Sequence, residues 1–284
     1  MRRGYVVGLL AGMWLVSCVP AQAVVLRYHP KVGEVVKHKI SMAGRMETTM
    51  PAAGQSMRME MTGVVDYAEK ALSETEETTR MENRWLGGKM SLKMNGESQS
   101  VDMPTGKLVV DLDRRGRMVK MVEAEFGGES PAGGMMGPDL ENLPTWSQFG
   151  AFPEDDVKVD DSWSEELEFP ALEGGPELTL VVNSRLLALT TYQERKCAKI
   201  RTSFEGPMSM DISKVAPAGA AAEGAMEAVL QGDMLWYYDY ENSVYVYAEG
   251  AIGMNMTMAM AGPEMAGGEM AMNMVMNVKY ALAE

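Results

Sequence analysis

The C-terminal part of the chain alternates in two runs, 244–260 and 270–282, on either side of a loop that contains Pro263 and several glycines. Every second residue of each run is apolar or glycine, and the residues between them are mixed. Eight alternating positions hold methionine, namely Met254, Met256, Met258, Met260, Met270, Met272, Met274 and Met276. A strict period of two is typical of strands with one buried face, and a Gly/Pro loop joins such strands as a hairpin. The pattern predicts a long antiparallel hairpin with a face of methionines.

The N-terminal part repeats this arrangement. Residues 36–50 and 57–67 alternate in the same way on either side of a turn that begins at Pro51. The methionines of one face include Met46, Met57, Met59 and Met61. Arg58 and Glu60 fall on the opposite face, as expected for a sheet with one buried and one solvated side. We therefore predict a second methionine-faced hairpin.

Shorter strand-like segments separate the two hairpins. They span 75–86, 90–94, 108–112, 118–122, 162–169, 178–190, 196–204 and 233–240. Helical signals are confined to 139–149, which Pro144 interrupts, and to the alanine-rich segment 216–228, which fits either a short helix or a loop. The predicted fold class is mainly β, with about twelve antiparallel strands and few short helices. The strands would form one curved sheet or half-barrel, or two packed sheets.

Two similar halves are predicted from recurring patterns. The start of the first half around Gly33 recurs around Asp161, and the hairpin that starts at Gly106 recurs at Gly232, with nearly constant offsets. The segment between the halves is rich in Gly, Pro and Glu, as linkers are. We divide the chain into a signal peptide (1–23), an N-terminal β half (24–126), a linker with a possible short helix (127–152) and a C-terminal β half (153–284).

The first residues resemble an export signal. Arg2 and Arg3 precede an apolar run, 5–16, and the triplet that ends at Ala23 fits a cleavage site. This predicts a secreted or periplasmic protein. Cys18 offers an alternative, because the preceding residues resemble a bacterial lipobox in which the cysteine is acylated. Contact with a membrane is expected only in that case, as a membrane-anchored lipoprotein.

The composition argues against several classes of function. A formal net charge of −14 disfavours nucleic acid as a partner. His29 and His38 are the only histidines, His38 shares the apolar stripe of its strand, and no catalytic or phosphate-binding motif is present. Cys197 has no histidine nearby and is predicted to be an inert strand residue, and the acidic residues 154–161 fit a solvated turn. We expect no enzyme and no cofactor.

Methionine is the residue that raises a functional question, because the chain contains 29 of them. One interpretation is core packing, since a flexible thioether fills irregular gaps. A second is a deformable apolar face for a hydrophobic small molecule or a protein partner. The residues of this predicted ligand face are Met46, Met57, Met59, Met61, Met254, Met256, Met258, Met272, Met274 and Met276. A third is a soft-metal site for Cu(I) or Ag(I), for which Met254, Met256, Met272 and Met274 are the candidates.

Two segments carry a resemblance to known proteins. The segment 26–34 is a tyrosine-, proline- and glycine-containing strand, and 153–163 opens the second half with Pro153, Val157 and Trp163. This pattern resembles a poorly characterised family of exported bacterial β-rich proteins without assigned activity. The strand-rich pattern also resembles the lipoprotein-carrier half-barrel in architecture. The expected function is an exported, non-enzymatic binding or scaffold protein with an apolar sheet face, with an envelope soft-metal protein as the alternative.

Overall fold

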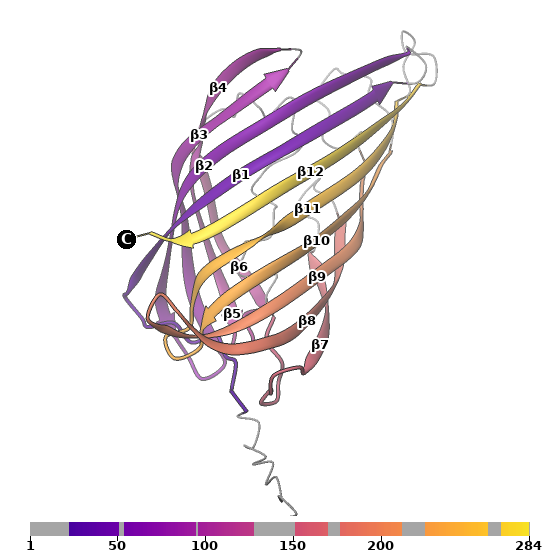
Figure 1. The fold of residues 1–284 in the computed structure, drawn as a ribbon. Helices are drawn as coiled ribbons and strands as arrows, with labels where there is room; N and C mark the ends of the chain where they lie inside the picture. Colours follow the sequence, from indigo (N-terminus) through magenta and orange to yellow (C-terminus); the bar gives the residue numbers. More distant parts are fainter. Residues whose placement is uncertain are drawn as a thin grey trace, which may run out of the picture.

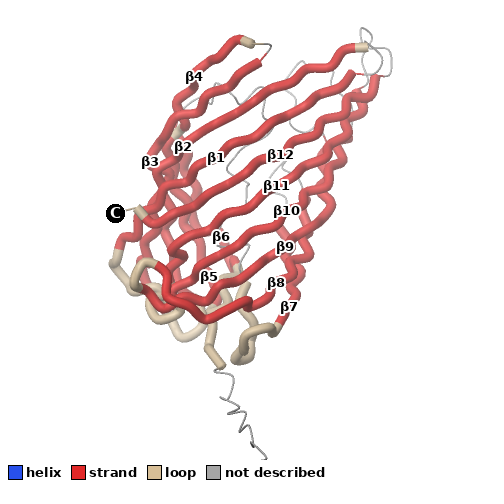
Figure 2. The backbone as a smooth tube through the Cα atoms, in the orientation of Figure 1, coloured by secondary structure: helices blue, strands red, loops and turns tan. Residues whose placement is uncertain are grey.

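A computed structural model describes residues 23–50, 54–94, 96–127, 151–169, 177–211, 225–260 and 268–283. These residues form strands and connecting loops, and the described part of the chain contains no helix (Figure 2). The strands are β1 (Val35–Met50), β2 (Gln55–Glu74), β3 (Thr78–Met94), β4 (Glu97–Met103), β5 (Thr105–Asp113), β6 (Met118–Gly127), β7 (Ser162–Phe169), β8 (Glu177–Tyr192), β9 (Arg195–Asp211), β10 (Ala225–Asp239), β11 (Val244–Met260) and β12 (Gly268–Leu282). The prediction of about twelve antiparallel strands is confirmed.

All strands belong to one open sheet with the order β6-β5-β3-β2-β1-β12-β11-β10-β9-β8-β7, and β4 pairs with β3 beside this path. Consecutive strands are neighbours almost throughout, and the first and last strands pair in the middle of the sheet (Figure 1). The two ends of this order are β6 and β7, which follow each other in the chain but do not pair within the described residues. The division of the chain into domains stays a prediction.

The sheet is curved so that one face is concave. Leu112 of β5 and Leu167 of β7 belong to strands near opposite edges, yet they lie in one continuous buried cluster. The same cluster contains residues from the middle of the sheet, such as Ile40 and Tyr280. Residues from both edges and the centre meet only on the inside of a strongly bent sheet. The fold is thus one open, strongly curved sheet, a half-barrel, which is one of the alternatives that the sequence leaves open.

Glycines on the concave face allow neighbouring strands to approach closely. A Cβ atom added at Gly206 would lie 1.8 Å from the carbonyl oxygen of Thr179, and one at Gly250 would lie 2.1 Å from the carbonyl oxygen of Asp233. At Gly232 the added atom would lie 2.2 Å from the ring of Phe204. Only glycine fits these positions, and glycine in a strand interior is typical of such close approach.

Two extended segments fill one end of the half-barrel, which we call the base. Val24 and Val157 form an isolated antiparallel bridge, and Leu26, Tyr28 and Phe152 next to this bridge are buried. The hydroxyl of Tyr238 donates a hydrogen bond of 2.5 Å to the carbonyl of Arg27, which ties the N-terminal segment to β10. The base is consequently a packed aromatic and aliphatic core.

Both methionine-faced hairpins are present with the predicted alternation, as β1–β2 and β11–β12. Some boundaries differ. The predicted strands 75–86 and 90–94 are one continuous strand, β3, and β10 begins at Ala225, inside the predicted alanine-rich insertion. Alanine has a low intrinsic preference for strands, but the backbone hydrogen bonds to β9 and β11 on both sides hold this segment in the sheet.

Residues 212–224 and the helix candidate 139–149 lie outside the described residues. Within the described residues no helix is long and apolar enough to cross a membrane.

Candidate ligand-binding face

A row of methionines crosses the concave face away from the base. Met46 of β1 lies directly opposite Met59 of β2 on one side and Met274 of β12 on the other. Met94 of β3 extends the row beyond Met59, and Met254 of β11 extends it beyond Met274. Residues directly opposite in an antiparallel pair have Cβ atoms about 4.5–5.5 Å apart, so these side chains are neighbours. We call these five residues the central methionine row.

Further methionines flank this row. Met272 lies opposite Met256, and Met258 lies opposite both Met270 and Met226. The whole set, which we call the methionine belt, consists of Met46, Met57, Met59, Met61, Met94, Met208, Met226, Met254, Met256, Met258, Met270, Met272, Met274 and Met276. Every methionine predicted for the ligand face belongs to the belt, and the four candidate metal ligands form two directly opposed pairs. Their role in binding stays a prediction.

Several belt residues are absent from the ligand face that the sequence predicts. Met94 belongs to a strand that the sequence indicates, but only its register with Met59 places it in the central row. Met208 and Met226 lie on parts of β9 and β10 that extend beyond the predicted strands 196–204 and 233–240. Alternation identifies the face of a residue on its own strand. It does not identify the residue opposite when the strands are not consecutive.

The belt is uncharged, whereas the outer face of β1, β2 and β3 behind it is charged and that of β11 and β12 carries exposed asparagines. On β1, β2, β11 and β12 the inward positions beside the central row carry only methionine, glycine, threonine, isoleucine or valine. On the outer face the Arg58 guanidinium lies 3.3 Å from Glu60, and the Lys93 ammonium lies 3.8 Å from the same carboxyl group. Met59 and Met61 are buried, while Met46, Met254 and Met274 are half-buried. The belt is thus an apolar surface that retains accessible area.

A polar cluster lies in the core near the base. The ring of His38 stacks on Tyr280 with centroids 4.3 Å apart, and its Nε2 atom lies 3.8 Å from the Glu69 carboxyl group. Burial raises the pKa of Glu69 to about 7 and lowers the pKa of His38 to about 3. The hydroxyl of Tyr67 donates to Asn83 Oδ1 at 2.7 Å. His38 is buried, as its place in the apolar stripe of its strand indicates, but neither ring nitrogen has a hydrogen-bond partner among the described residues.

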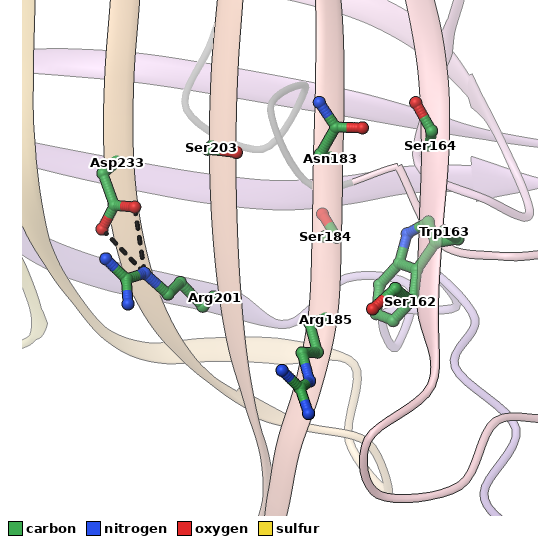
Figure 3. Close-up of a pocket in the computed structure, with 9 residues that line it drawn as sticks. All are labelled: Ser162, Trp163, Ser164, Asn183, Ser184, Arg185, Arg201, Ser203 and Asp233. Carbon is green, nitrogen blue, oxygen red and sulfur yellow. Dashed lines mark hydrogen bonds and ion pairs between the residues drawn. The ribbon is translucent and has the colours of Figure 1, made fainter.

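A separate open cavity of about 370 Å³ lies toward the β7 edge, and most of its lining is exposed polar side chains (Figure 3). The Arg201 guanidinium lies 3.0 Å from Asp233 within it, and Arg185 donates a 2.8 Å hydrogen bond to Asp160 beside it. Both arginines already have a carboxylate partner. No sequence pattern indicates this cavity, because its residues come from four strands, β7 to β10, that are far apart in the sequence.

The remaining sequence candidates have structural roles in the described part of the chain. The carboxyl group of Asp161 accepts a 2.8 Å hydrogen bond from the backbone of Lys158, as in a turn. Among the described residues no group of three or more His, Cys, Asp or Glu side chains is arranged to hold a metal ion. Cys197 is buried, and burial raises the pKa of its thiol to about 11. Cys18 and the signal-peptide prediction lie outside the described residues.

No protein-family model and no curated protein matches the chain. Two solved structures are similar at a low level. OpdQ of Pseudomonas aeruginosa is 6% identical, with a TM-score of 0.24, over 89% of this chain and 100% of that chain. A DUF1329 family protein from Desulfovibrio piger is 9% identical, with a TM-score of 0.16, over 84% of each chain.

Proposed function

We propose that the chain is a non-enzymatic binding protein, exported from the cell, whose methionine belt holds the acyl chain of a lipid-like molecule. The observation that carries the proposal is the uncharged, partly accessible belt on the concave face of a sheet whose outer face is charged on β1 to β3 and carries exposed asparagines on β11 and β12. Contiguous apolar surface of this kind is typical of ligand-binding or interaction sites. Methionine suits such a site because its unbranched side chain adapts to a flexible ligand.

The dimensions of the belt support an elongated ligand. The central row spans four inter-strand spacings of about 4.8 Å, or about 19 Å. Leu230 and Gly206 continue it across β10 and β9 for a further two spacings, about 10 Å. One leaflet of a bilayer has a hydrocarbon thickness of about 15 Å, half of the full core. The belt is therefore long enough for an acyl chain laid across the strands.

The non-enzymatic part of the proposal rests on the positions of the histidines. His38 lies in the core with its pKa lowered to about 3 by burial, so it remains neutral and out of reach of a substrate on the belt. His29 is exposed at the base, where its Nδ1 atom lies 2.6 Å from Glu74. Neither is positioned for proton transfer at the belt.

The test is a titration of the purified protein with a fluorescent polyene fatty acid, whose emission increases in apolar surroundings. Palmitate should displace the probe and butyrate should not. The variant Met274→Glu places a charge in the central row and should weaken binding at least tenfold, because burying the charge against an acyl chain is unfavourable. Asn273→Glu is the matched control, since Asn273 is the adjacent, exposed residue of the same strand, and should bind as the wild type does.

Circular dichroism spectra of both variants establish that the sheet is intact. A wild-type protein that does not bind the probe, or a Met274→Glu variant that binds it normally, would remove the acyl-chain proposal. The function would then be sought in a protein partner for the same face.

A further inference from the structure

The central methionine row brings thioether groups together in a way that packing alone does not require. A row nearer the base, separated from the central row by the rows of Gly44 and Met42, runs across seven adjacent strands through Val65, Ile40, Tyr280, Ala248, Trp236, Ile200 and Leu186. It packs the same concave face without a methionine. Leucine or isoleucine would fill the central row as well, because volume-conserving apolar exchanges cost little. The concentration of methionine in one part of the face thus indicates a use for sulfur.

The register supplies the geometry of a site. Met274 on β12 is flanked directly by Met46 on β1 and by Met254 on β11, so the middle residue faces a thioether on each side (Figure 1 shows the three adjacent strands). With Cβ atoms about 5 Å apart between neighbours, the sulfur atoms lie two bonds further out on flexible side chains. Rotation about these bonds allows the three sulfur atoms to turn toward one point above Met274.

The chemistry of the donors selects the ion. Thioethers are soft, neutral ligands that favour Cu(I), and by the same softness Ag(I), over harder ions such as Zn²⁺ and Mg²⁺. The adjacent inward positions provide no carboxylate, imidazole or thiolate; they are Gly44, Thr48, Ile252, Met256, Met272 and Met276. An ion bound here would be coordinated by sulfur alone, in uncharged surroundings that disfavour a divalent cation.

We propose that Met46, Met254 and Met274 form a binding site for one monovalent soft metal ion, Cu(I) or Ag(I), on the concave face. This inference is independent of acyl-chain binding, because it depends on the sulfur atoms of the row and not on its apolar character. Leucine keeps the apolar surface and removes the sulfur, so substitution by leucine separates metal binding from acyl-chain binding.

The experiment uses the triple variant Met46→Leu, Met254→Leu, Met274→Leu. Its matched control is Met81→Leu, Met103→Leu, Met121→Leu, which changes three methionines that lie in or against the core, outside the belt. Silver nitrate is titrated into each protein by calorimetry in a chloride-free buffer, and native mass spectrometry counts the ions bound. Cu(I) is then tested under anaerobic conditions by competition with a chromophoric chelator.

The wild type and the control triple should each bind one Ag(I) tightly, and the site triple should lose at least 100-fold in affinity. Binding of the fatty-acid probe should be unchanged in the site triple, so failure of the metal site and failure of the acyl-chain proposal give different results. Equal Ag(I) binding by the site triple, an equal loss in the control triple, or no binding by the wild type would overturn the proposal.

A second measurement uses only the wild-type protein and so does not depend on the folding of a variant. Hydrogen peroxide converts accessible methionines to the sulfoxide, and peptide mass spectrometry measures the rate at each one. A bound ion occupies a sulfur lone pair, so Ag(I) should slow oxidation at Met46, Met254 and Met274 at least fivefold. Met103 and Met121 should be oxidised at the same rate with and without Ag(I). Uniform protection, or none, would contradict a site at these three residues.

Discussion

The guanidinium of Arg115 contacts the carboxylate of Glu165 across the two edges of the open sheet. Arg115 lies in the turn between β5 and β6, and Glu165 lies on β7. The Nε atom of Arg115 also donates a 2.6 Å hydrogen bond to the carbonyl of Phe152. The two charged side chains are only 12% and 19% exposed, so the contact is shielded from water. It joins the edges at the base of the half-barrel.

Replacing Arg115 should therefore destabilise the fold. Arg115→Met keeps the apolar stem, removes the hydrogen bonds and leaves the shielded carboxyl group of Glu165 without this partner. We expect the free energy of unfolding to fall by about 2 kcal/mol, as for the loss of hydrogen bonds between charged groups. Urea denaturation measures this value. Arg58→Met removes an exposed ion pair with Glu60 and should change stability little. Equal effects of the two substitutions would show that the edge contact is not stabilising.

The sequence predicts the two methionine-faced hairpins well, because alternation and turn residues are local signals. It does not predict that Met46 lies opposite Met274, since pairing between the first and last strands depends on how the whole sheet closes on its core. The central row is visible only after that register is known. For the same reason, the soft-metal site that the sequence predicts is confined to β11 and β12 and does not include Met46.

The polar core shows a second limit of sequence reasoning. Glu69 continues the inward alternation of β2 after Tyr67, but a glutamate is normally assigned to the solvated face. Its carboxyl group is buried, and burial raises its pKa to about 7. The aromatic surroundings that make this possible come from other strands, such as Tyr280 on β12. No local pattern in β2 contains this information.

A single methyl group at Gly250 should disturb the bend of the sheet. The added Cβ atom would lie 2.1 Å from the backbone oxygen of Asp233 and 2.5 Å from the sulfur of Met234. We expect Gly250→Ala to lower the free energy of unfolding by about 2 kcal/mol, within the range for overpacked cores. Gly253 on the same strand is the control, because its added Cβ would meet the side chain of Gln231 at 3.3 Å and the backbone oxygen of Met274 at an ordinary contact distance of 3.8 Å. Gly253→Ala should be as stable as the wild type in thermal and urea unfolding.

The thiol of Cys197 should be unreactive in the folded protein. The side chain is fully buried, and burial raises the pKa of the thiol to about 11. At pH 8 only about one thiol in a thousand would be ionised, and the thiolate is the reactive form. Iodoacetamide should leave Cys197 unmodified in buffer and modify it fully in 8 M urea, as measured by peptide mass spectrometry. Rapid modification without urea would show that β9 opens readily.

The last prediction concerns the buried pair of Glu69 and His38. Their pKa values of about 7 and about 3 mean that both groups are uncharged near pH 5, so their 3.8 Å contact is not an ion pair. Tyr28, Tyr67 and Tyr280 face the same carboxyl group, and the pKa of each phenol is raised by burial. The three phenols therefore remain neutral while Glu69 and His38 titrate.

The two groups affect stability in opposite directions. Glu69 titrates near 4.5 when unfolded and near 7 when folded, so its contribution to stability is lost as pH rises through this interval, by about 3 kcal/mol. His38 titrates near 6.5 when unfolded and near 3 when folded, so its contribution is lost as pH falls from 6.5 toward 3. Between pH 4.5 and 6.5 the contribution of Glu69 falls and that of His38 rises as pH increases, so the pH dependence of stability from this pair largely cancels.

Glu69→Gln should reveal the pH dependence of stability that Glu69 contributes, because the amide keeps the shape of the side chain and does not titrate. The free energy of unfolding of this variant, relative to the wild type at the same pH, should increase by about 3 kcal/mol from pH 4.5 to pH 7.5. His38→Phe should show the opposite trend, with its stability relative to the wild type increasing as pH falls from 6.5 to 4.5. Urea denaturation at pH 4.5, 5.5, 6.5 and 7.5 provides the values. Differences that do not vary with pH would mean that both groups titrate in the fold as they do in water, and that the carboxyl group and the imidazole are reached by solvent.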